Sequence, residues 1–446
     1  MRVANRRAEN SKWRQTRLQA SKHAGQSWRA QGKSAGQAVL VAAAFLVSAC
    51  SQQPETAPTF HADDNPERLS DWGMIAATDG ALKLSDGVTP YDLATPLFSD
   101  YALKLRTVWT PDGKPAIYNA DEAFDFPVGT VITKTFYYPT PENAWTGDVQ
   151  QGQERGIHDR RMALDHLRLI ETRVLVRREA GWDALPYVWN EDQSDAVLKR
   201  TGAVIPMTLT RDNGEMEPFA YLVPNANQCA GCHATNATTK AIQPIGPKAR
   251  HLNKPSSFME GFNQLDHWLA KGLLTFSSEN SPLLRDARPL HPEEAPAGPA
   301  ESRPGDAVSK DEGRAPQDEE NFQFPRNADW SDETAPLAAR ARAYLDANCS
   351  HCHNPNGPAD TSGLDLEPGA SGPAMGHCKA PIAAGRGTGG RPYDIVPGRP
   401  DLSITVFRME TTDPGAMMPE LGRAVTHEEG VKLVREWIAA MEGVCS

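Results

Sequence analysis

Hydrophobic and polar residues alternate with a period of two along much of the chain between residues 67 and 225. The alternation is clearest over 131–136 and 167–176, and it is typical of β-strands because successive side chains of a strand point to opposite faces. Further strand-like runs cover 101–109, 185–190, 203–210 and 218–223. The turn sequences between runs are Pro111-Asp112-Gly113, Ala180-Gly181 and Asn213-Gly214. This pattern predicts a β-rich domain over 67–225, of the β-sandwich or jelly-roll type.

A helical period replaces the alternation toward the C-terminus. Apolar residues at i, i+4, i+7 and i+8 predict an amphipathic helix that leads into Cys349, and they are Leu337, Ala341, Tyr344 and Leu345. A second helix is predicted to begin at Thr426-His427-Glu428-Glu429, which has the form of a capping box. Its apolar face consists of Val434, Trp437, Ile438 and Met441. We therefore predict a mainly α-helical domain over 330–446, and a multidomain α+β protein as a whole.

A polar segment separates these two patterned regions. Ser278–Glu320 contains seven prolines and eleven acidic residues but no Phe, Trp or Tyr. Such a segment buries too little apolar surface to offset the entropy lost when it becomes ordered. We predict a disordered, acidic, proline-rich linker over 278–329, with semi-independent domains on either side of it.

The N-terminal region predicts export from the cytoplasm. Residues 1–37 contain nine Lys or Arg and one acid, and Ala38–Val47 is an apolar run of ten residues. The run is too short to span a bilayer, which takes about 20 residues. It has the length of the apolar core of a secretory signal, so we predict a signal peptide over 1–49.

The end of that signal, Leu46-Val47-Ser48-Ala49-Cys50, resembles a bacterial lipobox. The resemblance implies that Cys50 becomes the lipidated first residue of the mature protein, and Ser51 after it favours the outer membrane. An ordinary cleaved signal with an incidental cysteine is the alternative. The segment that follows is rich in Pro, Gln and Thr, so 50–66 is predicted to be a tether.

Composition and charge narrow the class of protein. The chain has 446 residues, of which 39% are hydrophobic, and this describes a soluble multidomain protein better than a polytopic membrane protein. Its formal net charge is −11 at pH 7, although the first 37 residues are strongly basic. The remainder is therefore more acidic still, which makes nucleic acid an unsuitable partner.

Four of the seven cysteines lie in two copies of one motif. These are Cys229-Ala230-Gly231-Cys232-His233 and Cys349-Ser350-His351-Cys352-His353, and both match C-x-x-C-H, the attachment site of c-type haem. In such a site the two thiols form thioethers with the porphyrin, and the histidine after them ligates the iron. We predict two covalently bound haem c groups, the first in the segment 226–277 and the second in the domain 330–446. His233 and His353 are the predicted proximal ligands.

A zinc site and a redox-active C-x-x-C are the alternatives for these cysteines. Paired C-x-x-C motifs in zinc ribbons lie about 15–20 residues apart, whereas these two motifs lie 120 positions apart. A redox disulfide leaves the histidine of both copies unexplained. The predicted export agrees with haem, because c-type haem is attached after translocation.

Cys378 and Cys445 belong to neither motif. In an oxidising compartment, two remaining thiols within one domain are more often bridged than free. We therefore predict a disulfide between them, with two buried unpaired cysteines as the alternative.

The presence or absence of a sixth ligand on each iron distinguishes electron transfer from small-molecule binding. A haem with two strong axial ligands carries electrons, whereas a haem with an open position binds small molecules. Met417-Met418-Pro419-Glu420-Leu421-Gly422 resembles the Met-Pro segment that supplies the distal sulfur in class I cytochromes c. Met418 is therefore predicted for the second haem, with Met417 and Met409 as alternatives. For the first haem, the first choice is Met259 in the helix-like stretch Ser257–Gly272. Its alternatives are His251, His267, His158, Met162, His166, Met207 and Met216.

Short segments along the chain together resemble one family, the exported bacterial dihaem c-type cytochromes with a β-rich N-terminal half. Besides the second C-x-x-C-H motif, they are Pro96-Leu97-Phe98-Ser99-Asp100-Tyr101, Glu171-Thr172-Arg173, Tyr187-Val188-Trp189-Asn190, Gly246-Pro247-Lys248, Ala343-Tyr344-Leu345-Asp346 and Pro397-Gly398. The resemblance extends from about residue 70 to 446, apart from the linker. It implies haem binding, electron transfer and a C-terminal domain like a class I cytochrome c.

The predicted function is that of a periplasmic, membrane-anchored dihaem cytochrome c that exchanges electrons with other periplasmic redox proteins. The alternative is a haem enzyme, either peroxidase-like or the haem subunit of a substrate dehydrogenase, in which the first haem is open. A third interpretation makes the β-rich domain a binding module for a partner or a surface glycan. Its arginines suit haem propionates or anionic ligands, although a solvated strand face explains them more simply: Arg155, Arg160, Arg161, Arg168, Arg173, Arg177 and Arg178.

Overall fold

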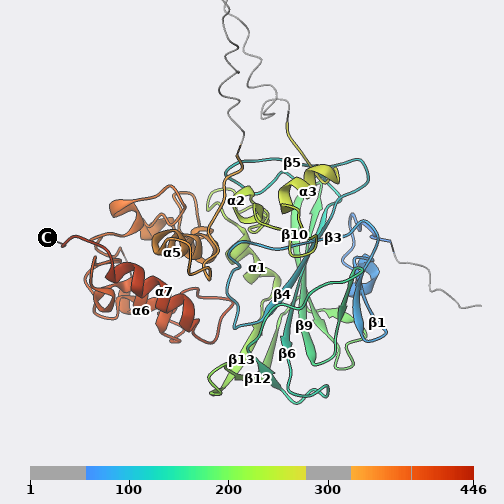
Figure 1. The fold of residues 1–446 in the computed structure, drawn as a ribbon, viewed down its shortest axis with the longest axis horizontal. Helices are drawn as coiled ribbons and strands as arrows, with labels where there is room; N and C mark the ends of the chain where they lie inside the picture. Colours follow the sequence, from blue (N-terminus) through green and yellow to red (C-terminus); the bar gives the residue numbers. More distant parts are fainter. Residues whose placement is uncertain (1–56, 278–322, 383, 446) are drawn as a thin grey trace, which may run out of the picture. The chain divides into compact units, whose positions relative to one another are not determined.

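The computed structural model describes residues 57–277, 323–382 and 384–445 (Figure 1). The predicted signal peptide, the predicted lipidation residue Cys50 and the predicted linker up to position 322 lie outside the described residues.

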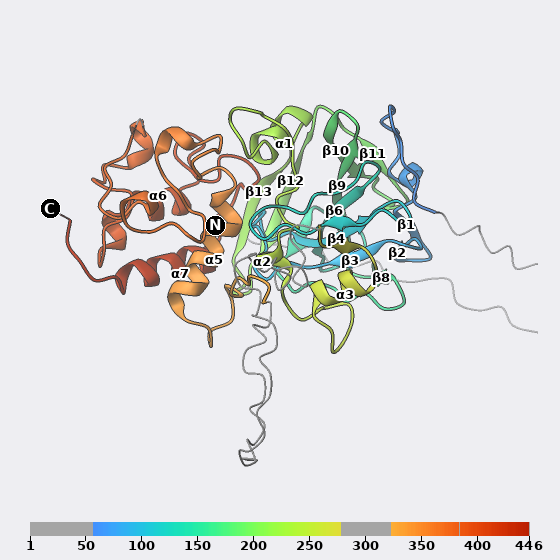
Figure 2. The same ribbon diagram turned by 90° about the horizontal axis from the view of Figure 1, so that it is seen from above.

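A six-stranded antiparallel sheet forms the centre of the β-rich N-terminal half (Figures 1 and 2). In their order across the sheet, its strands are β11 (Ala196–Leu198), β10 (Gly181–Trp189), β9 (Leu167–Arg178), β6 (Val131–Pro139), β4 (Leu103–Trp109) and β3 (Thr89–Tyr91). The hairpin of β9 and β10 turns at 179–180, one residue from the predicted turn. Four of the predicted strand-like runs therefore lie side by side in this sheet.

Three smaller sheets surround this central sheet. One contains β1 (Ile75–Thr78), β2 (Ala81–Leu84) and β8 (Arg161–Ala163), and a second contains β13 (Met216–Val223), β12 (Ala203–Thr210) and β7 (Asp148–Gln150). The third pairs β14 (Leu274–Thr275) with β5 (Ala116–Ile117) in parallel. β12 and β13 form a hairpin whose turn contains Asn213-Gly214, as predicted.

Both faces of the central sheet are covered, so burial along its strands does not follow the predicted alternation. One face packs on β1, β2 and the 3-10 helix Leu69–Trp72. The other face packs on α2 (Ala249–Leu252) and α3 (Gln264–Ala270) toward one end of the strands and on β12 and β13 toward the other. β6 and β9 are consequently buried along most of their length.

Threonines explain how polar positions fit inside a sheet that is covered on both faces. The hydroxyls of Thr107 and Thr133, on neighbouring strands, are 2.6 Å apart. Those of Thr135 and Thr172 are 2.8 Å apart, and Trp189 Nε1 donates to the Thr172 hydroxyl at 3.0 Å. A buried hydroxyl is costly unless it is hydrogen-bonded. The buried threonines of these strands therefore bond to partners on neighbouring strands and do not face water.

The described α-helices are α1 (Ala226–His233), α2, α3, α5 (Leu337–Leu345), α6 (Ile404–Glu410) and α7 (Glu428–Ala439). A π-helical turn, Asp346–Ser350, continues α5, and further 3-10 turns are Asp360–Ser362, Gly372–Met375, Gly385–Thr388 and Pro400–Leu402. In the C-terminal half, α5, α6 and α7 share one apolar core (Figure 1). That core contains Tyr344 and Leu345 from α5 and Val434, Trp437 and Ile438 from α7, which are residues of the two predicted apolar faces.

Two helix predictions need correction at their N-terminal ends. α7 begins after His427 without a side-chain cap, because the Thr426 hydroxyl donates to the Glu410 carbonyl at 3.0 Å. The predicted capping box is therefore not formed. The helix-like stretch Ser257–Gly272 is helical only from Gln264, where Asn263 caps it, so Met259 lies in the loop before α3.

Some described residues that were predicted to belong to the tether and to the linker are instead bonded to the folded part of the chain. Thr59 N donates to the Trp72 carbonyl at 2.9 Å, and Arg178 Nε donates to the His61 carbonyl at 3.1 Å, so the end of the segment 50–66 is fixed to the β-rich half. Residues 323–329 are likewise bonded, because Asn253 Nδ2 donates to the Phe324 carbonyl at 2.8 Å. These residues are held by hydrogen bonds to the folded part, and such bonds cannot be predicted from composition.

Buried hydrogen bonds also join the two halves that were expected to be semi-independent. Asp100, in the β-rich half, accepts from Ala424 N at 2.6 Å and from Val425 N at 3.0 Å. Phe98 N donates to Asn348 Oδ1 at 2.8 Å, next to the second C-x-x-C-H motif. These bonds need one defined placement of the segments that carry them, so the expectation of semi-independent domains is wrong.

Candidate functional site

The first C-x-x-C-H motif lies on α1, which begins three residues after β13 ends. Asn225 and Gln228 form a capping box at its start: Asn225 Oδ1 accepts from Gln228 N at 2.9 Å, and Gln228 Oε1 accepts from Asn225 N at 2.9 Å. The cap fixes where the helix begins. Cys229, Cys232 and His233 then fall at i, i+3 and i+4, which places them on one helical face.

The second motif begins on a longer helical segment, because α5 runs into the π-helical turn that contains Cys349. Cys352 N and His353 N both donate to the Cys349 carbonyl, at 3.1 and 2.9 Å. The chain therefore makes one more helical turn through the motif, and its two cysteines and histidine are held within that turn. All four motif cysteines carry free thiols in this structure.

The hydrogen bonds of the two motif histidines set the same tautomer in both. His233 Nδ1 lies 2.7 Å from the Gln243 carbonyl, which can only accept, so Nδ1 carries the hydrogen. His353 Nδ1 lies 3.0 Å from Ser362 Oγ, and this hydroxyl already donates to the Ala359 carbonyl at 2.7 Å, so it accepts from the histidine. Nε2 of each ring therefore keeps its lone pair, as an iron-ligating histidine requires.

Burial shifts the pKa values of both motif histidines and of the cysteine thiols in the same motifs. It lowers the pKa of His233 to about 4 and the pKa of His353 to about 4, so both rings are neutral near pH 7. Burial raises the pKa of Cys229, and it raises the pKa of Cys352 to about 12. Thiols that act as nucleophiles or redox centres have a lowered pKa, whereas these thiols are protonated at neutral pH.

The structure brings the two motifs into contact although 120 positions separate them in the sequence. Cys352 Sγ lies 3.8 Å from the Gly231 carbonyl oxygen. Ala237 N, just after the first motif, donates to the Asn356 carbonyl, just after the second, at 2.7 Å. Gly231 also faces the Met-Pro segment, because a Cβ atom at this glycine would lie 3.4 Å from Leu421 Cδ1.

A cavity of about 90 Å³ opens beside the first motif. This volume is below the range of about 300–1,000 Å³ that is typical of sites for larger ligands. Cys229 and His233 line it on one side, and cationic residues of the central sheet line it on another: Arg106, Lys134 and Arg173. Apolar residues complete its walls, including Leu93, Leu97, Ile132, Val174, Leu175 and Ile245.

The residues that the sequence predicts as sixth ligands of a first haem differ in position. His251 lines the cavity together with His233 and is 4% exposed. Met259 lies in the loop before α3 and is not among the residues that line this cavity. Burial lowers the pKa of His251 to about 4, so its ring is neutral. Outside this cavity, an open depression at Thr146, Pro206 and Phe219 is lined by no ionisable residue.

Met418, the candidate for the second haem, lies half-buried in the loop between α6 and α7. Its amide donates to the Arg408 carbonyl at 2.8 Å, and its carbonyl accepts from Arg423 Nε at 3.0 Å. The charge of Arg408 also acts on His353. The backbone of Met418 is thus fixed, and Met418 and His353 of the second motif share a neighbour in α6.

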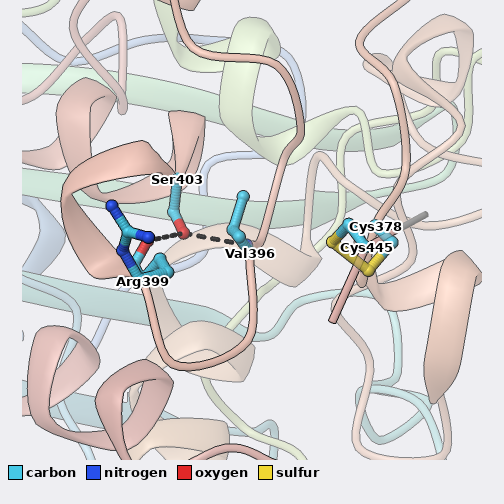
Figure 3. The surroundings of a disulfide bond; sticks show 5 residues. All are labelled: Cys378, Val396, Arg399, Ser403 and Cys445. Carbon is cyan, nitrogen blue, oxygen red and sulfur yellow. Dashed lines mark hydrogen bonds between the residues drawn. A yellow bond between two sulfur atoms is a disulfide. The ribbon is translucent and has the colours of Figure 1, made fainter. Parts of the chain in front are cut away.

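Cys378 and Cys445 form a disulfide with an S–S distance of 2.10 Å (Figure 3). It joins the segment after the 3-10 turn Gly372–Met375 to the segment after α7. Near it, Ser403 Oγ accepts from Val396 N at 2.9 Å and donates to the Arg399 carbonyl at 3.1 Å.

Several residues of the site could not be found from the sequence pattern. Asp346 and Arg250 form a buried ion pair between the segments that carry the two motifs. His351, inside the second motif, is 6% exposed, and its Nδ1 has no hydrogen-bond partner among the described residues. The sequence did contain an indication of the basic residues in the cavity wall. Lys134 and Arg173 occupy the middle of predicted strands, where an apolar or small residue is usual.

Comparison of the chain with protein-family models, with curated proteins and with solved structures gave no match. Within the described ranges, no helix has the length and apolar character that crossing a membrane requires. No group of three or more His, Cys, Asp or Glu side chains in the described part of the chain is arranged to hold a metal ion.

Proposed function

We propose that the protein is an exported dihaem c-type cytochrome that transfers electrons. The observation that carries this proposal is the contact between the two C-x-x-C-H motifs, with Cys352 Sγ 3.8 Å from the Gly231 carbonyl oxygen. Groups attached at the two motifs lie next to each other in this arrangement. One motif alone would support haem binding, whereas two adjacent motifs support a path for electrons through the chain.

The chain's own residues fit this cofactor. Cys229, Cys232, Cys349 and Cys352 are the attachment points, and His233 and His353 present Nε2 for the iron because their Nδ1 hydrogens are donated elsewhere. When bound, haem c alternates between ferric and ferrous iron and so carries one electron. The protein orients the two histidines and keeps them neutral, because burial lowers the pKa of each ring.

The finer description of the fold belongs to the same proposal. The β-rich half, with a central sheet covered by strands on both faces, supports the β-sandwich or jelly-roll interpretation. The C-terminal half, with α5 before the second motif and α7 as a closing helix, supports the interpretation as a class I cytochrome c-like domain. The resemblance to exported dihaem cytochromes agrees with both.

For the second haem, Met418 remains the proposed distal ligand, supported by its fixed backbone in the Met-Pro loop. For the first haem, His251 replaces Met259 as the favoured candidate, because it lines the same cavity as His233 and Met259 does not. A histidine pair and a His-Met pair both give a haem with two strong axial ligands, which suits electron transfer.

A haem enzyme with an open first haem is the second candidate function. The cavity of about 90 Å³ beside His233 favours it, because a molecule as small as peroxide needs only such a space. The two candidates differ in the spin state of the first iron. A low-spin iron that resists cyanide supports electron transfer, and a high-spin iron that binds cyanide supports the enzyme.

The experiment that tests the proposal has two parts. Mass spectrometry of the denatured mature protein is expected to show the polypeptide plus two haem masses, and zero or one haem would contradict the dihaem assignment. Electron paramagnetic resonance of the oxidised protein is expected to show two low-spin centres. A stoichiometric high-spin signal that disappears with cyanide would replace electron transfer by the enzyme function.

Location and partners follow from the same proposal. A signal over 1–49 and lipidation at Cys50 would place the protein in the periplasm, anchored to the outer membrane, with periplasmic redox proteins as partners. Mass spectrometry of the N-terminal peptide is expected to show an acylated Cys50. An unmodified Cys50 in haem-loaded protein would remove the anchor and leave the haem assignment standing.

A further inference from the structure

Three cations lie directly opposite one another across three neighbouring strands. Arg106 on β4 is in register with Lys134 on β6, and Lys134 is in register with Arg173 on β9. Directly opposed residues have Cβ atoms about 4.5–5.5 Å apart, and like charges at such positions destabilise a sheet. Lys104 adds a fourth cation on the same face, since it lies two residues before Arg106 on β4. We call Arg106, Lys134 and Arg173 the cationic row.

Carboxylates of the chain compensate this row only in part. Arg173 donates from Nε and Nη2 to Glu171 at 2.9 and 2.5 Å, which leaves its Nη1. Among the described residues, the carboxylate within 4 Å of Arg106 is that of Glu154, at 3.9 Å, which is too long for a hydrogen bond. The Arg106 side chain is nevertheless only 4% exposed, and it lines the cavity beside the first motif.

Lys134 is the least compensated member of the row. No carboxylate of the described residues lies within ion-pair distance of its Nζ, which is 5.0 Å from the centre of the Phe136 ring. Burial, reinforced by the charges of Arg173 and Arg106, lowers the pKa of Lys134 well below its usual range. Lys134 is half-buried, so its ammonium group is only partly solvated and is not paired with a carboxylate of the described residues.

The cationic row faces the cavity of the first motif, where all three of its members line the wall together with Cys229 and His233. The basic side chains of the row and Lys104 outnumber the carboxylates that act on them, which are those of Glu154, Glu171 and Asp100. A haem has two propionate carboxylates and an otherwise apolar macrocycle, and the remaining cavity wall is largely apolar. The charge and the polarity of the cavity therefore match this cofactor.

We infer that the cationic row binds the two propionates of the first haem. The inference rests on the proposed function, because it takes the group attached at Cys229 and Cys232 to be haem. Hydrogen bonds between a cation and a carboxylate are short and about twice as strong as neutral ones. By compensating the propionates, the row also raises the reduction potential of the first haem, since positive charge near the iron favours the ferrous state.

The test uses the full-length dihaem protein and the substitution Lys134→Met, which removes the charge and keeps the length of the side chain. The reduction potential of the first haem is expected to shift to lower values, and its propionate-bending band in resonance Raman spectra is expected to shift with the loss of a hydrogen bond. Lys134→Arg is expected to restore both. Arg177→Met is the matched control, because Arg177 also lies on β9 but is not part of the cavity wall.

The inference is overturned if Lys134→Met and Arg106→Gln change the potential and the Raman band no more than Arg177→Met does. If Lys134→Met does not fold, Arg106→Gln decides alone. A saturable change in the wild-type potential on addition of inorganic phosphate would also overturn it, because the row would then be open to a soluble anion. Failure of the proposed function gives a different result from these outcomes. In that case, mass spectrometry of the denatured protein would show no haem attached at Cys229 and Cys232.

Discussion

Arg250 and Asp346 form a buried bidentate ion pair that connects the segments carrying the two C-x-x-C-H motifs. Arg250 Nε and Nη2 donate to the two carboxylate oxygens of Asp346 at 2.8 and 3.0 Å, and both side chains are less than a tenth exposed. Asn327 Nδ2 and Ser350 Oγ also donate to Asp346, at 2.6 and 2.9 Å. The carboxylate therefore receives enough hydrogen bonds to remain ionised inside the protein.

The substitution Asp346→Asn is expected to lower the free energy of unfolding by about 3–5 kcal/mol, because it leaves the Arg250 guanidinium buried without its counter-ion. Denaturant unfolding monitored by fluorescence checks this. Glu436→Gln is the control, since Glu436 pairs with Lys432 on the exposed side of α7 and such pairs contribute about 0–1 kcal/mol. Equal losses in the two variants would contradict a structural role for the buried pair.

The same pair predicts how stability depends on pH. Burial tends to raise the pKa of Asp346, but the hydrogen bonds from Arg250 and Asn327 and the charge of Arg250 outweigh it and hold the pKa well below its usual range. A depressed pKa in the folded state stabilises the protein above the unfolded pKa of about 3.9, and this contribution is lost as the pH falls below that value. The stability difference between wild type and Asp346→Asn is therefore expected to be constant from about pH 5 to 7 and to shrink below about pH 4. Acid unfolding of both proteins measures it, and a difference that grows toward low pH would contradict the assignment.

Loss of the Cys378–Cys445 disulfide is expected to destabilise the protein by about 2–4 kcal/mol, because the bridge closes a loop with a sequence separation of 67 and restricts the unfolded chain. The measurement compares the unfolding midpoint of the double variant Cys378→Ser, Cys445→Ser with that of wild type. Peptide mapping without reduction is the control that establishes the bridge. Recovery of both cysteines as free thiols in the wild type would remove this prediction.

In the proposed dihaem cytochrome, Met418→Ala is expected to convert the second haem from low spin to high spin and to lower its reduction potential, because thioether ligation favours the ferrous state. Paramagnetic resonance and a redox titration measure the two effects. Met417→Ala is the matched control, since Met417 precedes Met418 in the same loop. If Met417→Ala gives the high-spin centre and Met418→Ala does not, the ligand is the neighbouring methionine.

In the proposed dihaem cytochrome, His251→Ala is expected to give a high-spin first haem, whereas Met259→Ala is expected to leave it low-spin. The reason is position, because His251 lines the cavity with His233 and Met259 lies in the loop before α3. His267→Ala on α3 is a further control. A high-spin centre produced by Met259→Ala, with His251→Ala unchanged, would return the ligand to the methionine that the sequence favours.

Local patterns determined the elements of this protein well. The alternation over 131–136 and 167–176 corresponds to β6 and β9, and the helical spacing before Cys349 corresponds to α5. These predictions succeed because side-chain period and turn residues act over a few neighbours in the chain. The same patterns misplaced the start of α7, where the Thr426 hydroxyl bonds to a residue sixteen positions away and does not cap the helix.

From the sequence alone, the chemistry that could be predicted was limited to the two C-x-x-C-H motifs and the pairing of Cys378 with Cys445. Tertiary structure decides three further facts. The two motifs touch, His251 lines the same cavity as His233, and Arg106, Lys134 and Arg173 form one row. Each of these facts depends on strand register or on contacts between segments about 30 to 120 positions apart. A one-residue change of register would turn every cation of the row to the other face of the sheet, and nothing within a single strand specifies that register.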